Sequence, residues 1–355
     1  MYRSTEFLIR ARCVANLRLK AQPRSLFASK ASMDQIKELR SQSSAPIGDC
    51  KKALEATDGN MSEAFDWLRK RGAAKASDLG GRDANEGLVA VVSNDFEAFI
   101  LQVGCETDFS QRNATFQSFV KAATQACFSH VPPPPSSGVH PVTLDALHNV
   151  LMPKTDGQTT PALSVGDKLA ELVGKIRENI SVRKAAKVVA MSGCVGAYVH
   201  GAVSPGVGLS AGVVALGVTP HSVEGGGGGG GGAAYEVTEA QLEVLRPVAK
   251  KLAMHVVAAK PSFVDETAVP EQLLEREKGV YREQAAATGK PANIVEKMVE
   301  GRLKKFYQDH TLAHQAHLID GNGATVAKVL AEHAKELGVA SIFVEGFAVY
   351  TTGSK

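Results

Sequence analysis

The chain has 355 residues, of which 44% are hydrophobic and 22% are charged, and its formal net charge is +3. This composition is typical of a soluble globular protein with one sizeable core, and it excludes a chain that is disordered throughout. No uncharged apolar run approaches the roughly 18 residues that a membrane-spanning helix requires, so we expect no membrane partner.

The first thirty residues differ in charge from the rest of the chain. They hold seven Lys or Arg against one acid, Glu6, with apolar residues such as Phe7 and Leu8 interleaved. This pattern is typical of an organellar transit peptide, and we expect residues 1–30 to be one, with an approximate boundary. The alternative is a disordered basic tail. Because this segment has a surplus of six positive charges, the remainder carries −3, and we expect no global attraction to nucleic acid.

Residues 33–72 predict three short helices. Their sequences, in order, are MDQIKELRSQ, PIGDCKKALEAT and MSEAFDWLRKRG. Pro46 suits the first turn of the second helix, and Gly72 is expected to end the third. Forty residues make only a marginal core. We therefore expect a small domain that a linker, residues 73–86, joins to something larger.

Residues 87–190 predict the first half of a larger core. The stretch EGLVAVVSNDFEAFILQVGCE predicts two strands around a turn at Asn94 and Asp95, and a helix capped by Asn113 follows. The stretch VPPPPSSGVHP, at 131–141, is expected to be a stiff extended connector, because consecutive prolines favour polyproline II. A further helix is expected in LSVGDKLAELVGKIRENI.

Residues 191–355 predict the second half of that core. A hairpin of GCVGAYVHGAV and GLSAGVVALGV precedes the glycine run 225–232, which we expect to be a flexible linker. A long helix, interrupted or kinked near Pro247, comes next. Residues 266–307 contain two charged amphipathic helices around a Gly-Lys-Pro turn, which predicts a projecting helical hairpin arm. With a last helix and strand, the fold class is α+β: a small three-helix domain, then a two-part core with antiparallel sheets and a projecting hairpin.

No sequence motif indicates an enzyme. The five cysteines are widely separated and are expected to be reduced and buried. The stretch HTLAHQAH, at 310–317, has ligand-like spacing, but no carboxylate pattern accompanies it, so we expect no metal site and no cofactor. A hydrolase or metal enzyme that uses these histidines is the rival hypothesis, and metal analysis of the purified protein would decide it. From its pattern alone, His200 packs at a strand end.

The stretch GCETDFSQRNATFQSFV closely resembles the signature of the elongation factor Ts family. IKELRSQSSAPIGDCKKALEATDGNMSEAFDWLRKRG resembles the family's amino-terminal ubiquitin-associated-like domain. KIRENISVRKAA, HVVAAKPSF and GKPANIVEKMVEGRLKKF resemble its core and its helical arm. These matches keep the family's order over most of residues 33–310. The basic leader, and API where bacterial members usually carry a Gly-Met-Met-like sequence, resemble a mitochondrial member of plant type.

The resemblance implies a nucleotide-exchange factor for the translational GTPase elongation factor Tu, without covalent chemistry. It implies that the factor binds GDP-bound and nucleotide-free elongation factor Tu in the mitochondrial matrix, with no direct contact to nucleic acid. By the matching Thr-Asp-Phe motif, Asp108 and Phe109 are implied to be a wedge that displaces the parts of the GTPase that hold magnesium and the phosphates. The further contact residues that the resemblance implies are Thr107, Ile176, His200, Leu39, Ile47, Met298 and Val299.

Three positions depart from the family's pattern. Ser110 stands where many members have valine, which we expect to reduce the apolar area of the wedge. Arg177 occupies a position often held by glycine, and this puts the contact beside Ile176 in question. Gly48 replaces a bulky residue, so we expect weaker partner binding by the small domain.

Two other interpretations follow from pattern alone. Asp108 and Phe109 also fit a helix cap followed by a half-buried aromatic residue. The alternative function is a ubiquitin-binding adaptor built on residues 33–72, without exchange activity. That hypothesis predicts affinity for ubiquitin and leaves the large carboxy-terminal core unexplained.

Overall fold

The structure is a computed structural model of the chain, and it describes residues 31–43, 45–153, 162–221, 236–286, 291–320 and 322–353. The chain divides into two compact units, residues 1–66 and residues 67–355. The predicted transit peptide and the glycine run 225–232 lie outside the described residues, as do two residues of the predicted arm turn, 289 and 290.

The first unit consists of short helices around a small core. Helix α1 spans Met33–Ser43, α2 spans Ile47–Ala56, and α3, Met61–Leu79, begins in this unit and ends in the second. Ser32 and Gln35 exchange two hydrogen bonds of 3.1 Å at the start of α1, which satisfies a free donor of its first turn. The three predicted helices are confirmed. Their apolar faces form the core of this unit, which contains Ile36, Leu39, Cys50, Ala53, Leu54 and Ala64.

Helix α3 continues past Gly72, where we predicted its end. A Cβ added at Gly72 would lie 2.9 Å from the carbonyl oxygen of Ala170, so glycine permits a close approach to helix α7, Val165–Ile176. Glycine inside a helix is less stable than alanine by about 1 kcal/mol, a loss that such packing can offset. The first part of the predicted linker 73–86 is therefore helical as far as Leu79.

The second unit contains two antiparallel sheets. The first has the strand order β3-β4-β2-β1-β6, and the second has the order β5-β7-β8. The two predicted hairpins are confirmed as β1-β2 and β5-β7. The strands span, in chain order, β1 Glu86–Ser93, β2 Glu97–Cys105, β3 Gly138–Pro141, β4 Ser181–Val189, β5 Gly193–His200, β6 Val207–Gly208, β7 Ser210–Thr219 and β8 Ser341–Thr351.

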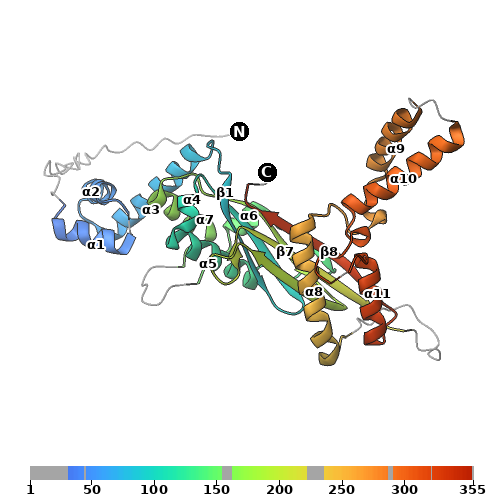
Figure 1. The fold of residues 1–355 in the computed structure, drawn as a ribbon. Helices are drawn as coiled ribbons and strands as arrows, with labels where there is room; N and C mark the ends of the chain where they lie inside the picture. Colours follow the sequence, from blue (N-terminus) through green and yellow to red (C-terminus); the bar gives the residue numbers. More distant parts are fainter. Residues whose placement is uncertain are drawn as a thin grey trace, which may run out of the picture. The chain divides into compact units, whose positions relative to one another are not determined.

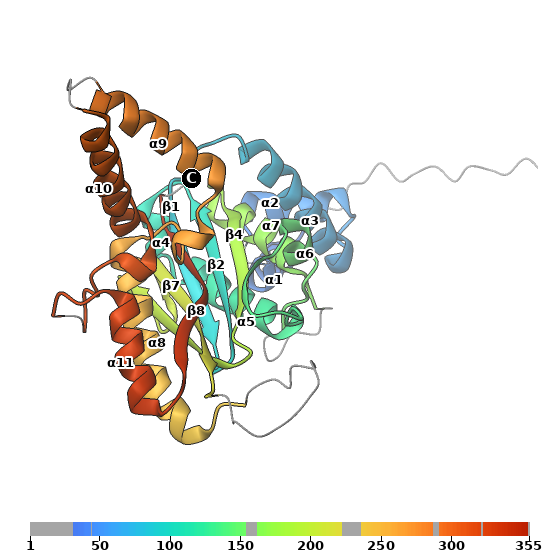
Figure 2. The ribbon, with the colours of Figure 1, turned by 90° about the vertical axis from the view of Figure 1, so that its right-hand side faces the viewer.

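Helices cover the outer face of each sheet (Figures 1 and 2). On β2, Phe99 and Leu101 face an apolar cluster shared with α7 and with α5, Ala114–His130. Ala98 and Ile100 face the second sheet, as the alternation of strand side chains requires. Another apolar cluster joins the second sheet to helices α8, Glu239–Ala259, and α11, Val326–Leu337. The other helices of this unit span α4 Asp108–Arg112, α5 Ala114–His130, α6 Leu144–His148, α8 Glu239–Ala259, α9 Glu271–Ala286, α10 Ala292–His310 and α11 Val326–Leu337, with 3-10 turns at Glu266–Ala268 and Leu312–His314.

Three segments form strands that we did not predict: β3, β4 and the two-residue β6. Strand β4 contains the adjacent charges Arg183 and Lys184, which interrupt its apolar pattern, and its Lys187 is buried, with its Nζ 2.9 Å from a carboxylate oxygen of Glu97. Strand β3 forms the end of the predicted extended connector. It lies at the sheet edge, where Pro141 is tolerated because the missing N–H is not needed for a ladder on the open side.

Helices α9 and α10 form the predicted helical hairpin. Figure 1 shows the pair extending away from the two sheets. Ala285 and Val299 are buried in the hairpin, and the guanidinium of Arg302 lies 5.9 Å from the ring centroid of Tyr281. None of the helices in the described part of the chain is long and apolar enough to cross a membrane.

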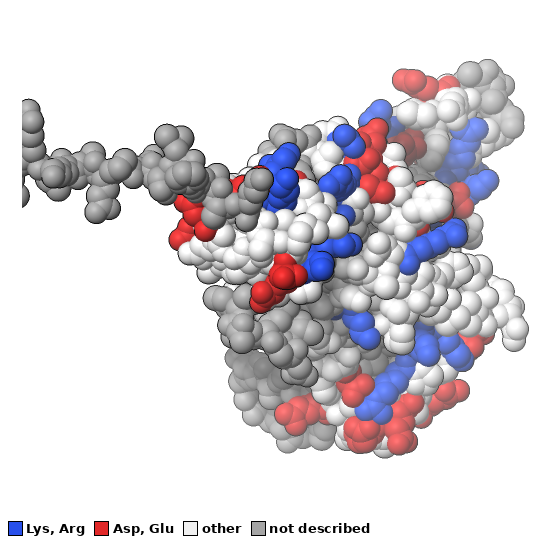
Figure 3. All heavy atoms as spheres, turned by 90° about the vertical axis from the view of Figure 1, so that its left-hand side faces the viewer, with Lys and Arg blue, Asp and Glu red and all other residues white. Residues whose placement is uncertain are grey.

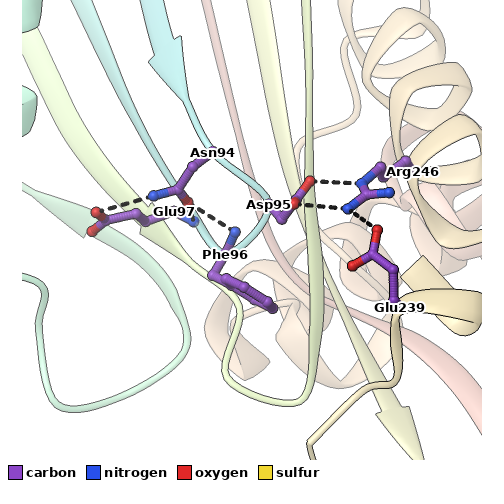
Figure 4. Close-up of polar contacts among 6 residues, drawn as sticks. All are labelled: Asn94, Asp95, Phe96, Glu97, Glu239 and Arg246. Atoms are coloured by element: carbon purple, nitrogen blue, oxygen red, sulfur yellow. Dashed lines mark hydrogen bonds and ion pairs between the residues drawn. The ribbon is translucent and has the colours of Figure 1, made fainter. Parts of the chain in front are cut away.

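Helix α8 is a continuous helix through Pro247, so of the predicted interruption or kink the interruption does not occur. It begins with a capping box between Thr238 and Gln241. Its Arg246 binds the tip of the β1-β2 hairpin, where Nε and Nη2 donate to the two carboxylate oxygens of Asp95 at 2.8 and 2.9 Å (Figure 4). Arg246 also donates to Glu239, at 2.8 Å. This network ties the first sheet to the helix that covers the second.

We expect Asp95→Asn to lower the free energy of unfolding at pH 7 by less than about 1 kcal/mol, because the ion pair is partly exposed. The hydrogen bond from Arg246 holds the pKa of Asp95 below its ordinary value of 3.8. A depressed pKa contributes stability that is present above the ordinary value and is lost as the pH falls through the folded-state pKa. Urea unfolding at several pH values should therefore show the two proteins converging below about pH 4. A difference that persists in acid would contradict this assignment.

Candidate functional site

The candidate site is centred on the turn that follows β2. Thr107 caps helix α4, and its side chain accepts a hydrogen bond from the Ser110 N–H. Phe109, in the first turn of α4, is 80% exposed, more than any other large apolar residue described. The half-buried aromatic predicted from pattern alone is therefore wrong. We call residues 107–112 the wedge turn.

Glu178 holds the first residue of the wedge turn, Thr107. Its two carboxylate oxygens accept hydrogen bonds from the Thr107 hydroxyl at 2.7 Å and from the Thr107 N–H at 3.2 Å. Hydrogen bonds to a charged acceptor are stronger than neutral ones, and a bidentate pair also fixes direction. The backbone of the turn is thus fixed at Thr107, two residues before Phe109.

Gln111 joins the other end of the wedge turn to the start of β1. Its side-chain amide is buried and donates to Glu86 at 2.9 Å and to the carbonyl oxygen of Gly87 at 2.8 Å. Beneath the turn, the Cys105 thiol donates to the carbonyl oxygen of Thr107 at 3.2 Å. Burial, reinforced by nearby carboxylates, raises the pKa of this thiol to about 12, so it stays protonated and keeps donating.

The outer surface of the wedge turn combines an exposed carboxylate with the exposed ring. Asp108 forms an ion pair of 3.2 Å with Arg112, and both side chains are at least half exposed. An acidic residue in the first turn of a helix is favourable. Ser110, by contrast, is buried, so its difference from valine changes internal packing and leaves the exposed apolar area unchanged, contrary to our expectation. The arrangement suits insertion of an aromatic ring into a partner.

Ile176 lies at the end of α7, two residues before Glu178. It is half-buried against the core of the first sheet. Arg177 ends the helix with φ +67°, in the left-handed region, which explains why glycine suits this position. The same connection therefore places Ile176 at the surface and delivers the carboxylate that holds the wedge turn.

We expect Arg177→Gly to be more stable than Arg177→Ala by about 1 kcal/mol. Both substitutions remove the guanidinium and its contacts, so their difference isolates the left-handed backbone that a Cβ disfavours. Urea unfolding of the two variants measures this difference. Equal stabilities would show that the backbone at this helix end relaxes without strain.

His200 is exposed at the end of β5, with its Nδ1 3.4 Å from the Tyr198 hydroxyl. Its carbonyl oxygen accepts from the N–H of Leu209, directly after β6, and β6 pairs with β1 near the residues that hold Gln111. This strand contact brings the His200 turn to the region of the wedge turn. Two apolar side chains that the sequence did not single out, Val203 and Leu209, are 41% and 38% exposed in the same turn.

The remaining predicted contact residues differ in exposure. In the first unit, Ile47 is 52% exposed, and a Cβ added at the neighbouring Gly48 would meet open space. Leu39 is fully buried in the core of that unit, and Val299 is 6% exposed in the α9-α10 hairpin. Met298 is half-buried. Leu39 and Val299 are thus packing residues in this conformation, whereas Ile47 and Met298 present side-chain surface.

The histidines of 310–317 do not converge on a ligand position. His317 stacks on His255, with ring centroids 5.3 Å apart, and Nε2 of His255 lies 3.0 Å from the Gln315 side-chain oxygen. Burial lowers the pKa of both rings, so they pack as neutral groups. Within the described ranges, no group of three or more His, Cys, Asp or Glu has a geometry that can hold a metal ion.

Charge is mixed on the face of the molecule drawn in Figure 3. Lys and Arg alternate there with Asp and Glu, and neither sign covers the face.

Comparison with known proteins places these features in a family. A family model described as elongation factor TS matches residues 106–354, which include the whole wedge turn. Elongation factor Ts of Paramagnetospirillum magneticum is 36% identical over 318 residues, covering 90% of each chain, and that of Rhodospirillum rubrum is 36% identical over 90% of this chain and 91% of its own. The mitochondrial elongation factor Ts of Ricinus communis is 36% identical over 88% of this chain and 78% of its own. The chain belongs to the elongation factor Ts family.

Proposed function

We propose that this protein is a guanine-nucleotide exchange factor for elongation factor Tu that acts in translation elongation and performs no covalent chemistry. Family membership supports the partner. The single structural observation that supports the mechanism is Phe109, 80% exposed on a turn that hydrogen bonds of Thr107 and Gln111 hold at its two ends.

In the proposed mechanism, insertion of Phe109 lowers the affinity of the GTPase for GDP. Phe109 enters the GTPase next to the elements that hold magnesium and the nucleotide phosphates, and Asp108 contacts the same region. Displacing these elements weakens GDP. Because coupling between two ligands is reciprocal, GDP must weaken binding of the factor by the same ratio. The tightest complex is therefore nucleotide-free, and rebinding of GTP dissolves it.

We further propose that the protein acts in the mitochondrial matrix. The support is the mitochondrial relative from Ricinus communis together with the basic, acid-poor composition of residues 1–30. Residues 33–72 are proposed to be the ubiquitin-associated-like domain, with Ile47 as its contact residue. Residues 87–190 and 191–355 are proposed to be the two halves of the core, of which 266–307 is the arm.

The test is the release of a fluorescent GDP analogue from organellar elongation factor Tu, in the presence of excess unlabelled nucleotide. We expect the protein without residues 1–30 to accelerate release by about tenfold or more. Added GDP should also weaken its binding to the GTPase. If a correctly folded protein gives no acceleration, the proposed function is wrong.

A further inference from the structure

Two distant connections of the chain are joined beneath the wedge turn. Glu178 accepts two hydrogen bonds from Thr107, and in return Glu106 accepts one from the Asn179 N–H at 2.6 Å. Each connection thus donates a backbone N–H to the carboxylate of the other. Asn179 is 5% exposed, and its side chain donates to the carbonyl oxygen of Arg82 at 2.6 Å. We call Glu106, Thr107, Glu178 and Asn179 the crossed clasp.

Helix α4 needs this clasp. It has five residues, whereas isolated helices shorter than about 12 residues are marginal in water. Phe109 has little packing of its own, because 80% of its surface is exposed. The direction of its ring therefore depends on the backbone of the wedge turn. Glu178 holds its first residue through the Thr107 N–H, and the Gln111 side chain joins its other end to the carbonyl oxygen of Gly87.

A disordered wedge turn would weaken partner binding. A protein whose binding-competent state is only partly populated shows an affinity reduced by that fraction. Ordering the turn before binding removes this loss without any direct contact between the clasp and the partner. The clasp also joins the turn rigidly to the end of α7, two residues from Ile176.

We propose that Glu178 is a positioning residue for nucleotide exchange, which acts through Thr107 to hold Phe109 in the orientation that enters the GTPase. This inference rests on the proposed function. The role makes a specific prediction: loss of Glu178 weakens binding only as long as Phe109 is present.

The experiment uses the chain without residues 1–30 and measures three quantities for each variant: affinity for nucleotide-free elongation factor Tu, maximal rate of GDP release, and melting temperature. The variants are Glu178→Ala, Glu178→Gln, Phe109→Ala and the double variant Glu178→Ala/Phe109→Ala. The matched control is Glu336→Ala, which removes an exposed carboxylate of α11 whose partner, His333, lies in the same helix.

We expect Glu178→Ala to weaken binding about tenfold, with a nearly unchanged maximal rate and a melting temperature lower by a few degrees at most. Glu178→Gln, which keeps one acceptor oxygen for Thr107, should fall between the wild-type protein and Glu178→Ala. The double variant should bind no more weakly than Phe109→Ala alone, because the two residues act as one unit. Glu336→Ala should behave as the wild-type protein.

Two results would overturn the inference. One is wild-type affinity in Glu178→Ala. The other is an additive loss in the double variant, which would mean that Glu178 acts independently of Phe109. If Glu178→Ala fails to fold, Glu178→Gln and its double variant with Phe109→Ala supply the same comparison. Failure of the proposed function is distinguishable, since the wild-type protein would then not accelerate GDP release at all.

Discussion

Phe109→Ala should reduce the acceleration of GDP release by about 30-fold or more, with no loss of stability. The ring is 80% exposed, so its removal leaves the core of the second unit intact. In the proposed complex, however, the ring is the apolar group that would enter the GTPase, and exposed aromatic anchors of this kind contribute at least about 2 kcal/mol to binding. Stopped-flow release of fluorescent GDP measures the rate, and circular dichroism and thermal unfolding confirm the fold.

The chain offers a matched control in Phe96. This residue is 48% exposed at the tip of the β1-β2 hairpin, where Asn94 fixes the turn by accepting from the N–H groups of Phe96 and Glu97 (Figure 4). The nine residues of β2 separate Phe96 from Phe109 by about 30 Å. Phe96→Ala should keep the wild-type exchange rate. Equal losses in both variants would mean that general apolar contact, and not the wedge turn, carries the activity.

Much of the fold could be predicted because local patterns agree with tertiary packing. Strand β2 and the cap at Asn113 are read correctly from sequence, since the apolar residues of β2 pack in the core and Asn113 satisfies the helix end. The missed strand β4 contains Arg183 and Lys184, and its pairing with β2 joins residues that lie far apart in the chain. The end of α3 was wrongly predicted at Gly72 for a similar cause. The glycine there permits close packing against Ala170, which lies far away in the sequence.

The candidate site was predictable only in part. The exposed residues of the wedge turn were identified by resemblance, and the structure places them on a held turn. The residues that hold them were not identified, because Glu178 lies 71 positions from Thr107 and nothing local marks the contact. Burial was also invisible in the sequence. Leu39 and Val299 were expected to be contact residues from the resemblance, yet their apolar side chains are buried between helices.

Gly196→Ala should lower the free energy of unfolding by about 3 kcal/mol or more, the largest loss of stability that we expect. A Cβ at this position of β5 would lie 2.2 Å from the carbonyl carbon and 2.4 Å from the carbonyl oxygen of Ala249 in α8. These atoms are backbone, so no side-chain rotation can make room. Ala249 is also fully buried, so α8 must move away from the sheet and open the apolar cluster beneath it.

Gly301→Ala provides a control of opposite sign. Gly301 lies inside α10, and a Cβ there would meet nothing within 4 Å. The same substitution should raise local helix stability by about 0.5 to 1 kcal/mol, because alanine favours the helix and restricts the unfolded chain. Thermal unfolding followed by circular dichroism compares the two variants. A Gly196→Ala protein that melts with the wild-type protein would show that α8 does not pack on β5 as closely as the structure places it.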